Sequence, residues 1–257
     1  MTPTNRSADD KTGLAAMGTH ATVAAKEREQ ERVRSWFDAV YERRGVRYLR
    51  PATAYPIYMQ LLGVQPGEAL LDVGCGPGLL LEAALRRDLH ASGVDLSSTA
   101  IELAKARVPG ATVCVGNAEA LDFEAARFDY VTCIGSLERM LDRRQVLAEM
   151  QRVAKPEARF CFLVRNCEHA TWRVWHRALG RRNRSAHQDA LTLDAWRDLF
   201  ETSGFEIERV LPDQWPRQRL RRALGLGPRD GRDERVHVGR LPLRWALEFL
   251  FLLKKRA

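Results

Sequence analysis

Three glycines at alternating positions, Gly74, Gly76 and Gly78, are the first feature of this sequence that suggests chemistry. They follow a short apolar run at 69–73 and precede a helix-forming run at 79–85, which predicts a buried strand, a loop and a helix. A loop without side chains lets the backbone approach a ligand closely, and the following helix begins with unpaired N–H groups. The stretch is therefore a candidate nucleotide site, although a glycine triplet also suits a tight strand-to-helix connection.

An acid at the end of the next predicted strand strengthens this interpretation. Asp95 ends the apolar run 91–95 and lies 21 residues after Gly74. In a right-handed βαβ unit the end of the second strand lies beside the first loop, where a carboxylate can accept hydrogen bonds from both ribose hydroxyls. The alternative is that Asp95 only caps the helix that begins near Ser97 and Ser98.

Predicted strands and helices alternate along the chain around these residues. This pattern predicts an open parallel sheet with helices on both faces, in which ligands bind at the carboxyl ends of the strands. A final strand at 247–253 is preferred over a helix and would close the sheet beside strands five and six. The expected helices cover 26–44, 54–62, 97–107, 143–153, 193–203 and a short stretch near 214–224, and the other strands cover 112–115, 128–134, 159–164 and 205–211.

Length and composition favour one domain. A chain of 257 residues is near the upper size for a single hydrophobic core. We expect a disordered leader at 1–25 and one domain at 26–257. Within that domain we predict N-terminal helices at 26–63, a binding core at 68–165, an inserted basic cap at 166–191 and a C-terminal part at 192–257.

Cysteine usage and hydropathy point to a reduced compartment. The five cysteines form no Cys-x-x-Cys pair, the N-terminus lacks a signal-peptide pattern, and the late apolar run 245–253 is too short to span a membrane. The prediction is a cytoplasmic protein, at most peripheral to a membrane.

Taken together, these motifs resemble the class I S-adenosylmethionine-dependent methyltransferases, especially small-molecule enzymes such as those of quinone biosynthesis. Most of the resemblance lies in Leu71–Gly78, where a Gly-x-Gly-x-Gly pattern follows the acid Asp72. The supporting matches are Gly93–Ser97, Gly116–Leu121, Phe128–Val131 and Glu149–Pro156. The resemblance implies a Rossmann-like, doubly wound seven-stranded sheet, mostly parallel with an antiparallel last strand, with helices on both faces and an inserted cap. It also implies S-adenosyl-L-methionine as cofactor and S-adenosyl-L-homocysteine as product.

The resemblance further implies roles for single residues. Backbone at Gly74, Cys75 and Gly76 would face the methionine moiety, Asp72 would steady the loop or the amino group, and Asp95 would hold the ribose hydroxyls. Leu96 and Ala118 would flank the adenine. Asn117 stands where relatives usually place an acid, and its amide oxygen can still accept a hydrogen bond. The remaining expected cofactor residues are Gly78, Ile134 and Tyr41, and for Tyr41 and Tyr48 core packing is the alternative.

The implied reaction is methyl transfer to a small molecule that is apolar, anionic or bound to a carrier, with O-, N- and C-methylation all open. No metal is expected. Glu138 and His187 are the candidate bases, and His169 and His176 also lie in the region of the predicted cap.

The basic segments leave other functions open. Arginine runs invite a nucleic-acid methyltransferase, but the sequence 134–137 lacks the Asn/Asp-Pro-Pro-aromatic run of base N-methyltransferases, so nucleic acid is disfavoured. The basic segments could instead bind an acidic carrier or an anionic membrane surface. They combine arginines with tryptophans, among them Arg181, Arg182, Trp172, Trp175, Trp215 and Trp245. A cofactor-binding regulator without catalysis is the third possibility.

Overall fold

The computed structural model describes the chain outside residues 1–8, 171–188, 217–218, 221–223, 225–241 and 257, and within the first helix it describes side chains from residue 24 onward. Its centre is a seven-stranded sheet in the order β3-β2-β1-β4-β5-β7-β6. All pairs are parallel except those of β7, which runs antiparallel to both β5 and β6. This confirms the predicted mixed, Rossmann-like sheet with an antiparallel last strand.

The strands are β1 (Ala69–Val73), β2 (His90–Asp95), β3 (Thr112–Val115), β4 (Phe128–Ile134), β5 (Ala154–Arg165), β6 (Phe205–Pro212) and β7 (Glu248–Lys255). The helices are α1 (Asp9–Arg44), α2 (Pro56–Leu62), α3 (Leu79–Leu85), α4 (Ser98–Arg107), α5 (Arg143–Val153) and α7 (Leu193–Thr202). Short 3₁₀ turns η1 (Gly45–Tyr48), η2 (Ala52–Ala54), η3 (Leu137–Arg139) and η4 (Leu243–Trp245) join them.

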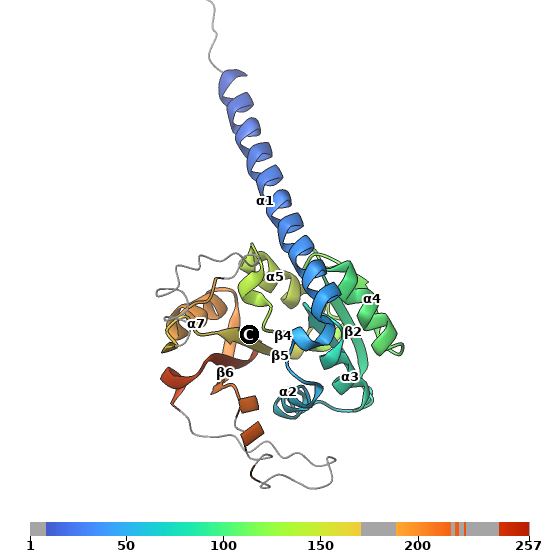
Figure 1. Ribbon diagram of the computed structural model, residues 1–257. Helices are drawn as coiled ribbons and strands as arrows, with labels where there is room; N and C mark the ends of the chain where they lie inside the picture. The colour runs from blue at the N-terminus through green and yellow to red at the C-terminus, as the bar shows by residue number, and fades with distance from the viewer. Residues whose placement is uncertain (1–8, 171–188, 217–218, 221–223, 225–241, 257) are drawn as a thin grey trace, which may run out of the picture.

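Two hydrophobic layers hold the sheet between helices (Figure 1). Successive strand residues point to opposite faces, so Leu70 packs into the layer with α2, α3 and α4 while Leu71 packs into the layer with α5 and α7. The second layer is rich in aromatic rings, among them Trp196 and Phe200 of α7, both fully buried. Burial on both faces explains why the central strands read as continuous apolar runs.

Two boundaries differ from the sequence expectation by more than two residues. Helix α1 begins at Asp9 and extends outward from the body of the molecule, so residues 9–25 are helical rather than a disordered leader (Figure 1). That stretch contains five alanines, the best helix former, which outweigh its polar composition. Strand β5 begins at Ala154 rather than Arg159, because Ala154 already pairs with Phe128. Pro156 is tolerated there because the β4–β5 pairing is irregular between Phe128 and Tyr130.

Most of the predicted cap lies outside the described residues, and so does part of the predicted helix near 214–224. The predicted domain limits stay a prediction. Among the helices that the structure describes, none combines the length and the apolar character needed to cross a membrane.

Candidate functional site

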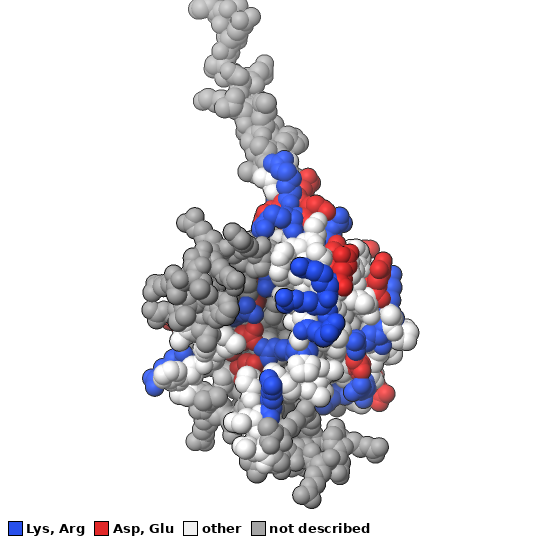
Figure 2. Space-filling model, in the orientation of Figure 1, with Lys and Arg blue, Asp and Glu red and all other residues white. Residues whose placement is uncertain are grey.

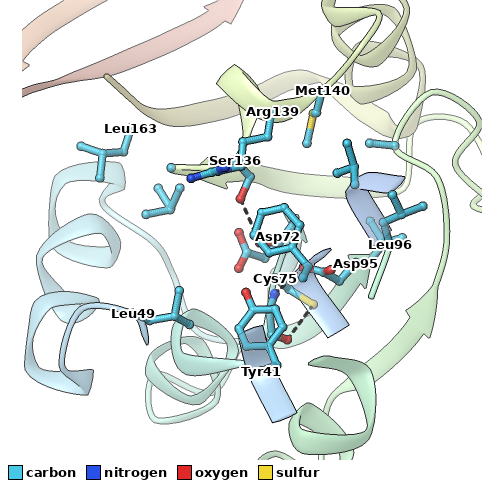
Figure 3. Close-up of a pocket in the computed structure, with 18 of the residues that line it drawn as sticks. Tyr41, Leu49, Asp72, Cys75, Asp95, Leu96, Ser136, Arg139, Met140 and Leu163 are labelled. Atoms are coloured by element: carbon cyan, nitrogen blue, oxygen red, sulfur yellow. Dashed lines mark hydrogen bonds between the residues drawn. The ribbon is translucent and has the colours of Figure 1, made fainter. Parts of the chain in front are cut away.

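A cavity of about 410 Å³ lies at the carboxyl ends of β1, β2 and β4, where the strand order reverses direction. This is the position at which open α/β sheets bind ligands, and the volume is in the usual range for small-molecule sites. Figure 2 shows a hollow in the face below α1, with lysine and arginine side chains gathered around it. In Figure 3, Tyr41 and Leu49 lie on one side of the cavity and Ser136, Arg139 and Met140 on the other, with Asp72 between them.

The glycine loop forms one wall of this cavity through a left-handed backbone. Gly74 and Gly76 have φ angles of 74° and 50°. A Cβ atom at Gly76 would lie 2.9 Å from the Tyr41 hydroxyl oxygen, and one at Gly74 would lie 2.6 Å from Ser136. Larger residues at either position would therefore collide with neighbours as well as strain the backbone.

The amide groups of the loop are already bonded within the protein. Gly74 and Cys75 both donate to the Val94 carbonyl, at 2.8 and 3.0 Å, and the Gly76 amide donates to Asp95 Oδ2 at 2.8 Å. An anion such as phosphate would find these donors occupied. The charged groups near the loop are carboxylates instead, which favours a ligand with positive charge at this point.

Gly78 is placed differently from the expectation, because it does not line the cavity. It precedes α3 with a φ of 79°, and a Cβ there would lie 3.0 Å from Val108 and 3.4 Å from Ala104. Its role in the structure is to let α3 pack closely against α4.

Asp95 connects the loop to the next helix. Besides the Gly76 amide, its carboxylate accepts the Ser97 amide at 2.9 Å, while Ser97 itself caps α4 by accepting the Ala100 amide. Burial raises the pKa of Asp95. A carboxylate has about four lone-pair sites, so its two oxygens can still accept further hydrogen bonds from a ligand. The capping alternative and the binding prediction are thus compatible.

Asp72 is a second acid beside the glycine loop and is 3% exposed. The Thr132 hydroxyl donates to its Oδ1 at 2.7 Å. Desolvation raises the pKa of Asp72 to about 7, and the negative charge of Asp95 adds to the shift. A positive ligand group beside Asp72 would relieve this penalty.

The far end of the cavity is formed by residues that follow β2 and β3. Leu96, Asn117 and Ala118 all line it, as does Ile134, the last residue of β4. The Asn117 amide oxygen accepts the Glu119 amide at 3.0 Å, so part of its capacity is used within its own turn. A carbonyl oxygen has a second lone pair that a ligand can use.

Helix α1 covers the cavity from outside the sheet. Val33, Phe37 and Tyr41 line the cavity, and burial raises the pKa of the Tyr41 phenol well above its usual value. Asp38 ties the helix down by accepting the Ser97 hydroxyl at 2.5 Å and the Thr99 amide at 3.2 Å. This anchor holds the aromatic face of α1 over the glycine loop.

The structure does not support the predicted base Glu138. Its side chain is fully buried and does not line the cavity, and burial raises the pKa of its carboxyl. The Glu138 carboxyl therefore lies in the wall, away from any acceptor in the cavity. His176 and His187 lie outside the described residues, and His169, which is described, does not line the cavity.

Several lining residues were not identified from sequence. They come from segments that the motifs do not connect, and they form much of the cavity wall away from the glycine loop: Leu49, Arg50, Tyr55, Ser136, Arg139, Met140, Leu163, Arg165 and Glu248. Tyr48, which the sequence suggested together with Tyr41, also lines the cavity. In the part of the chain that the structure describes, no cluster of His, Cys, Asp and Glu is arranged to hold a metal ion.

Known proteins are similar to this chain in sequence and in fold. A family model described as "Methyltransferase domain" matches residues 71–162. Ubiquinone biosynthesis O-methyltransferase of Hahella chejuensis is 33% identical over 132 residues, which are 49% of this chain and 55% of that protein. The protein of the same name from Thiobacillus denitrificans is 39% identical over 95 residues, 35% and 41% of the two chains. The chain thus spans about half the length of the curated relatives it matches.

Solved structures share the fold at lower identity. A putative methyltransferase of Haloferax volcanii, in complex with a methyltransferase activator, has a TM-score of 0.63 at 20% identity, covering 88% of this chain and 98% of that one. A possible histamine N-methyltransferase of Thermotoga maritima has a TM-score of 0.60 at 18% identity, covering 86% and 97%.

Proposed function

We propose that this chain, which belongs to the class I S-adenosylmethionine-dependent methyltransferases, transfers a methyl group from S-adenosyl-L-methionine to a small-molecule acceptor. One observation carries the proposal. The carboxylates of the buried Asp72 and the partly buried Asp95 flank a glycine loop whose amides are already bonded, so the site suits a nucleoside with a cationic amino-acid part rather than a phosphate.

The residues in the cavity fit this cofactor. Asp72 would accept the ammonium of the methionine part, next to Gly74, Cys75 and Gly76, and the free lone pairs of Asp95 would accept the ribose hydroxyls. Leu96, Asn117, Ala118 and Ile134 would surround the adenine, and Tyr41 would close the loop from α1. When bound, the cofactor supplies an electrophilic methyl group on a sulfonium.

The protein's own contribution is positioning and exclusion of water. The aromatic face of α1 covers the cavity on the outside, and the acceptor side between β4 and β5 is lined by Leu49, Leu163 and Met140. The printed function of the curated relatives favours an oxygen atom as methyl acceptor. The proposed function includes no membrane or carrier contact of the predicted cap, because most of the cap lies outside the described residues.

Calorimetry with S-adenosyl-L-homocysteine tests the cofactor site. Asp95→Ala should weaken binding by more than about tenfold, since charged hydrogen bonds to the ribose are lost. Glu102→Ala, an exposed acid on α4, is the control and should bind like the wild type. Because Asp95 also holds the loop, thermal unfolding of both variants must show that they fold. An unchanged Kd for Asp95→Ala would remove the assignment.

Turnover is tested separately, by measuring S-adenosyl-L-homocysteine formation with a panel of catechols and phenols. Product formation supports the enzyme. Cofactor binding without product for any acceptor class, including nitrogen and carbon nucleophiles, would favour a non-catalytic binding protein.

A further inference from the structure

Helix α1 covers the cavity with one of its sides and packs on neither layer of the core. Four of its residues line the cavity at spacings of three or four positions, which places them on one side of the helix: Gln30, Val33, Phe37 and Tyr41. As far as the structure describes the chain, neither hydrophobic layer includes a side chain of α1. The apolar side of α1 therefore faces the space that a ligand would fill.

Polar contacts hold α1 at two points along its length. Lys26 Nζ lies 2.6 Å from Glu119 Oε2 and 3.4 Å from Asp142 Oδ2, and the Lys26 side chain is 40% exposed. Toward the other end of α1, the Asp38 carboxylate accepts the hydroxyl of Ser97 at the start of α4. Partly exposed ion pairs and single hydrogen bonds contribute little to stability, so these contacts can break and form again while the domain stays folded.

The aromatic rings of α1 contact groups at the edge of the cavity. The guanidinium carbon of Arg139 lies 5.3 Å from the ring centres of Trp36 and Phe37. The ring of Tyr48 meets those of Trp36 and Tyr41 edge to face, with 6.1 Å between ring centres in both pairs. Arg139 and Tyr48 themselves line the cavity. These attachments of α1 therefore surround the ligand space and do not belong to the core.

A single glycine connects α1 to the rest of the chain. Gly45 directly follows the helix, has a φ of 50°, and has no protein atom within 4 Å of the place where a Cβ would lie. Glycine adopts other backbone angles at little cost, and hinges are typically a few residues at the end of an element. A change of backbone angles at Gly45 can therefore swing α1 away from the cavity.

The closed position of α1 is connected to the residues assigned to the cofactor. Ser97, which Asp38 holds, donates its amide to Asp95 Oδ1 at 2.9 Å. The other oxygen of Asp95 accepts the Gly76 amide, and a Cβ at Gly76 would lie 2.9 Å from the Tyr41 hydroxyl. A ligand held by Asp95 and the glycine loop would therefore lie directly against α1.

We propose that α1 is a lid that turns about Gly45 and closes on the bound nucleoside, so that opening of α1 controls the release of S-adenosyl-L-homocysteine. The inference rests on the proposed function, because the nucleoside is the cofactor or its product. Without a ligand the apolar side of α1 meets water in the cavity and gains less from closing. A bound nucleoside gives this side a partner, and a ligand that binds one of two states more tightly shifts the population toward that state.

Hydrogen exchange of backbone amides, followed by mass spectrometry, tests the lid on the full chain. Peptides from residues 26–44 are compared with peptides from α7, in the free protein and with saturating S-adenosyl-L-homocysteine. We expect the ligand to slow exchange in α1 by about tenfold more than in α7, because only α1 closes on it. Calorimetry on the same samples establishes whether the ligand is bound.

Two glycine variants test the hinge with matched backbone strain. Gly45→Ala penalises the left-handed φ of the closed position, so it should speed exchange in α1 and speed ligand release about fivefold in a chase with unlabelled S-adenosyl-L-homocysteine. Gly67→Ala is the control, because Gly67 has a φ of 81°, also has open space at its Cβ position, and lies in the turn before β1. It should keep wild-type release and wild-type exchange in α1. Thermal unfolding checks that both variants fold.

Three results would overturn the lid. They are equal slowing of exchange in α1 and α7, exchange in α1 of the free protein that is already as slow as in α7, and equal ligand release from the two glycine variants. If S-adenosyl-L-homocysteine binds and one of these results is found, the proposed function stands without the lid. An absence of binding in calorimetry at millimolar ligand would refute the proposed function, and the lid with it.

Discussion

Replacing Asp72 by asparagine should stabilise the ligand-free protein, because the cavity keeps a carboxylate where burial opposes its charge. Desolvation raises the pKa of Asp72 from 3.8 to about 7. Each pKa unit corresponds to about 1.4 kcal/mol, so ionised Asp72 costs the folded state about 4 kcal/mol. Asparagine has nearly the same shape, and its amide oxygen can accept the hydrogen bond that Thr132 donates to Asp72.

The sign and the pH window follow from the direction of the shift. Between pH ~4 and ~7 the folded state binds more protons than the unfolded state, so wild-type stability falls as the pH rises through this range. Below it the carboxyl is neutral in both states, and above it the penalty is complete. The stability gained by Asp72→Asn should therefore be small near pH 4, grow up to pH ~7 and then stay constant at about 4 kcal/mol.

Urea unfolding of both proteins at several pH values between 4 and 8.5 measures this difference. Asp198→Asn changes an exposed acid on α7 and is the control, with an expected difference near zero. The same Asp72→Asn protein should bind S-adenosyl-L-homocysteine at least tenfold more weakly at pH 8, because no charge then balances the ligand's ammonium. A variant that is less stable than the wild type at pH 8, or a difference independent of pH, would refute the reasoning.

Three further substitutions test other parts of the site. Gly76→Ala should weaken S-adenosyl-L-homocysteine binding at least tenfold, because its Cβ would lie 2.9 Å from the Tyr41 hydroxyl, and adding Tyr41→Phe should restore part of the loss in calorimetry. Asp38→Ala removes the anchor of α1, so limited proteolysis should cut α1 faster and the Kd for S-adenosyl-L-homocysteine should rise. The free energy of unfolding in urea should fall by about 1 kcal/mol. Unchanged cleavage would contradict the anchoring role. Trp196→Ala empties a fully buried site and removes a hydrogen bond to the Arg165 carbonyl at 3.0 Å, and should cost about 3–5 kcal/mol in urea unfolding.

The part of the cavity around the glycine loop could be predicted from sequence because its elements are local. β1 and α3 have the predicted bounds, since glycines at 74, 76 and 78 separate an apolar run from a helix former within a few residues. Asp95 is found by its distance from that loop along the chain, and the parallel pairing of β1 with β2 then brings the two together. The packing role of Gly78 was not predicted, because a glycine needed for close helix contact has the same sequence pattern as one that faces a ligand.

Local sequence patterns did not predict the start of α1, the start of β5 or the position of the Glu138 side chain. The extension of α1 to Asp9 follows from alanine-rich propensity in a stretch without an apolar stripe, so hydrophobic periodicity did not indicate it. The early start of β5 depends on pairing with β4 across an irregularity at Pro156. Glu138 was a candidate base because it follows β4, but it lies in the 3₁₀ turn η3 with its side chain buried outside the cavity lining, while the next residue, Arg139, lines the cavity.

The cavity wall away from the glycine loop could not be predicted in this way, because its residues come together only through the order of the strands in the sheet. Arg50, Arg139 and Arg165 are separated by 89 and 26 positions, and in sequence each is one of 41 basic residues without a distinguishing neighbour. They meet because β4 and β5 are adjacent in the sheet and β7 returns antiparallel beside β5, which places Glu248 opposite Arg165. The last strand thus supplies the carboxylate that pairs with Arg50 and Arg165 at the cavity, although it lies far from the glycine loop in the sequence. A change in acceptor specificity should accordingly need substitutions at the ends of β5 and β7 and in η3, and can leave the glycine loop intact.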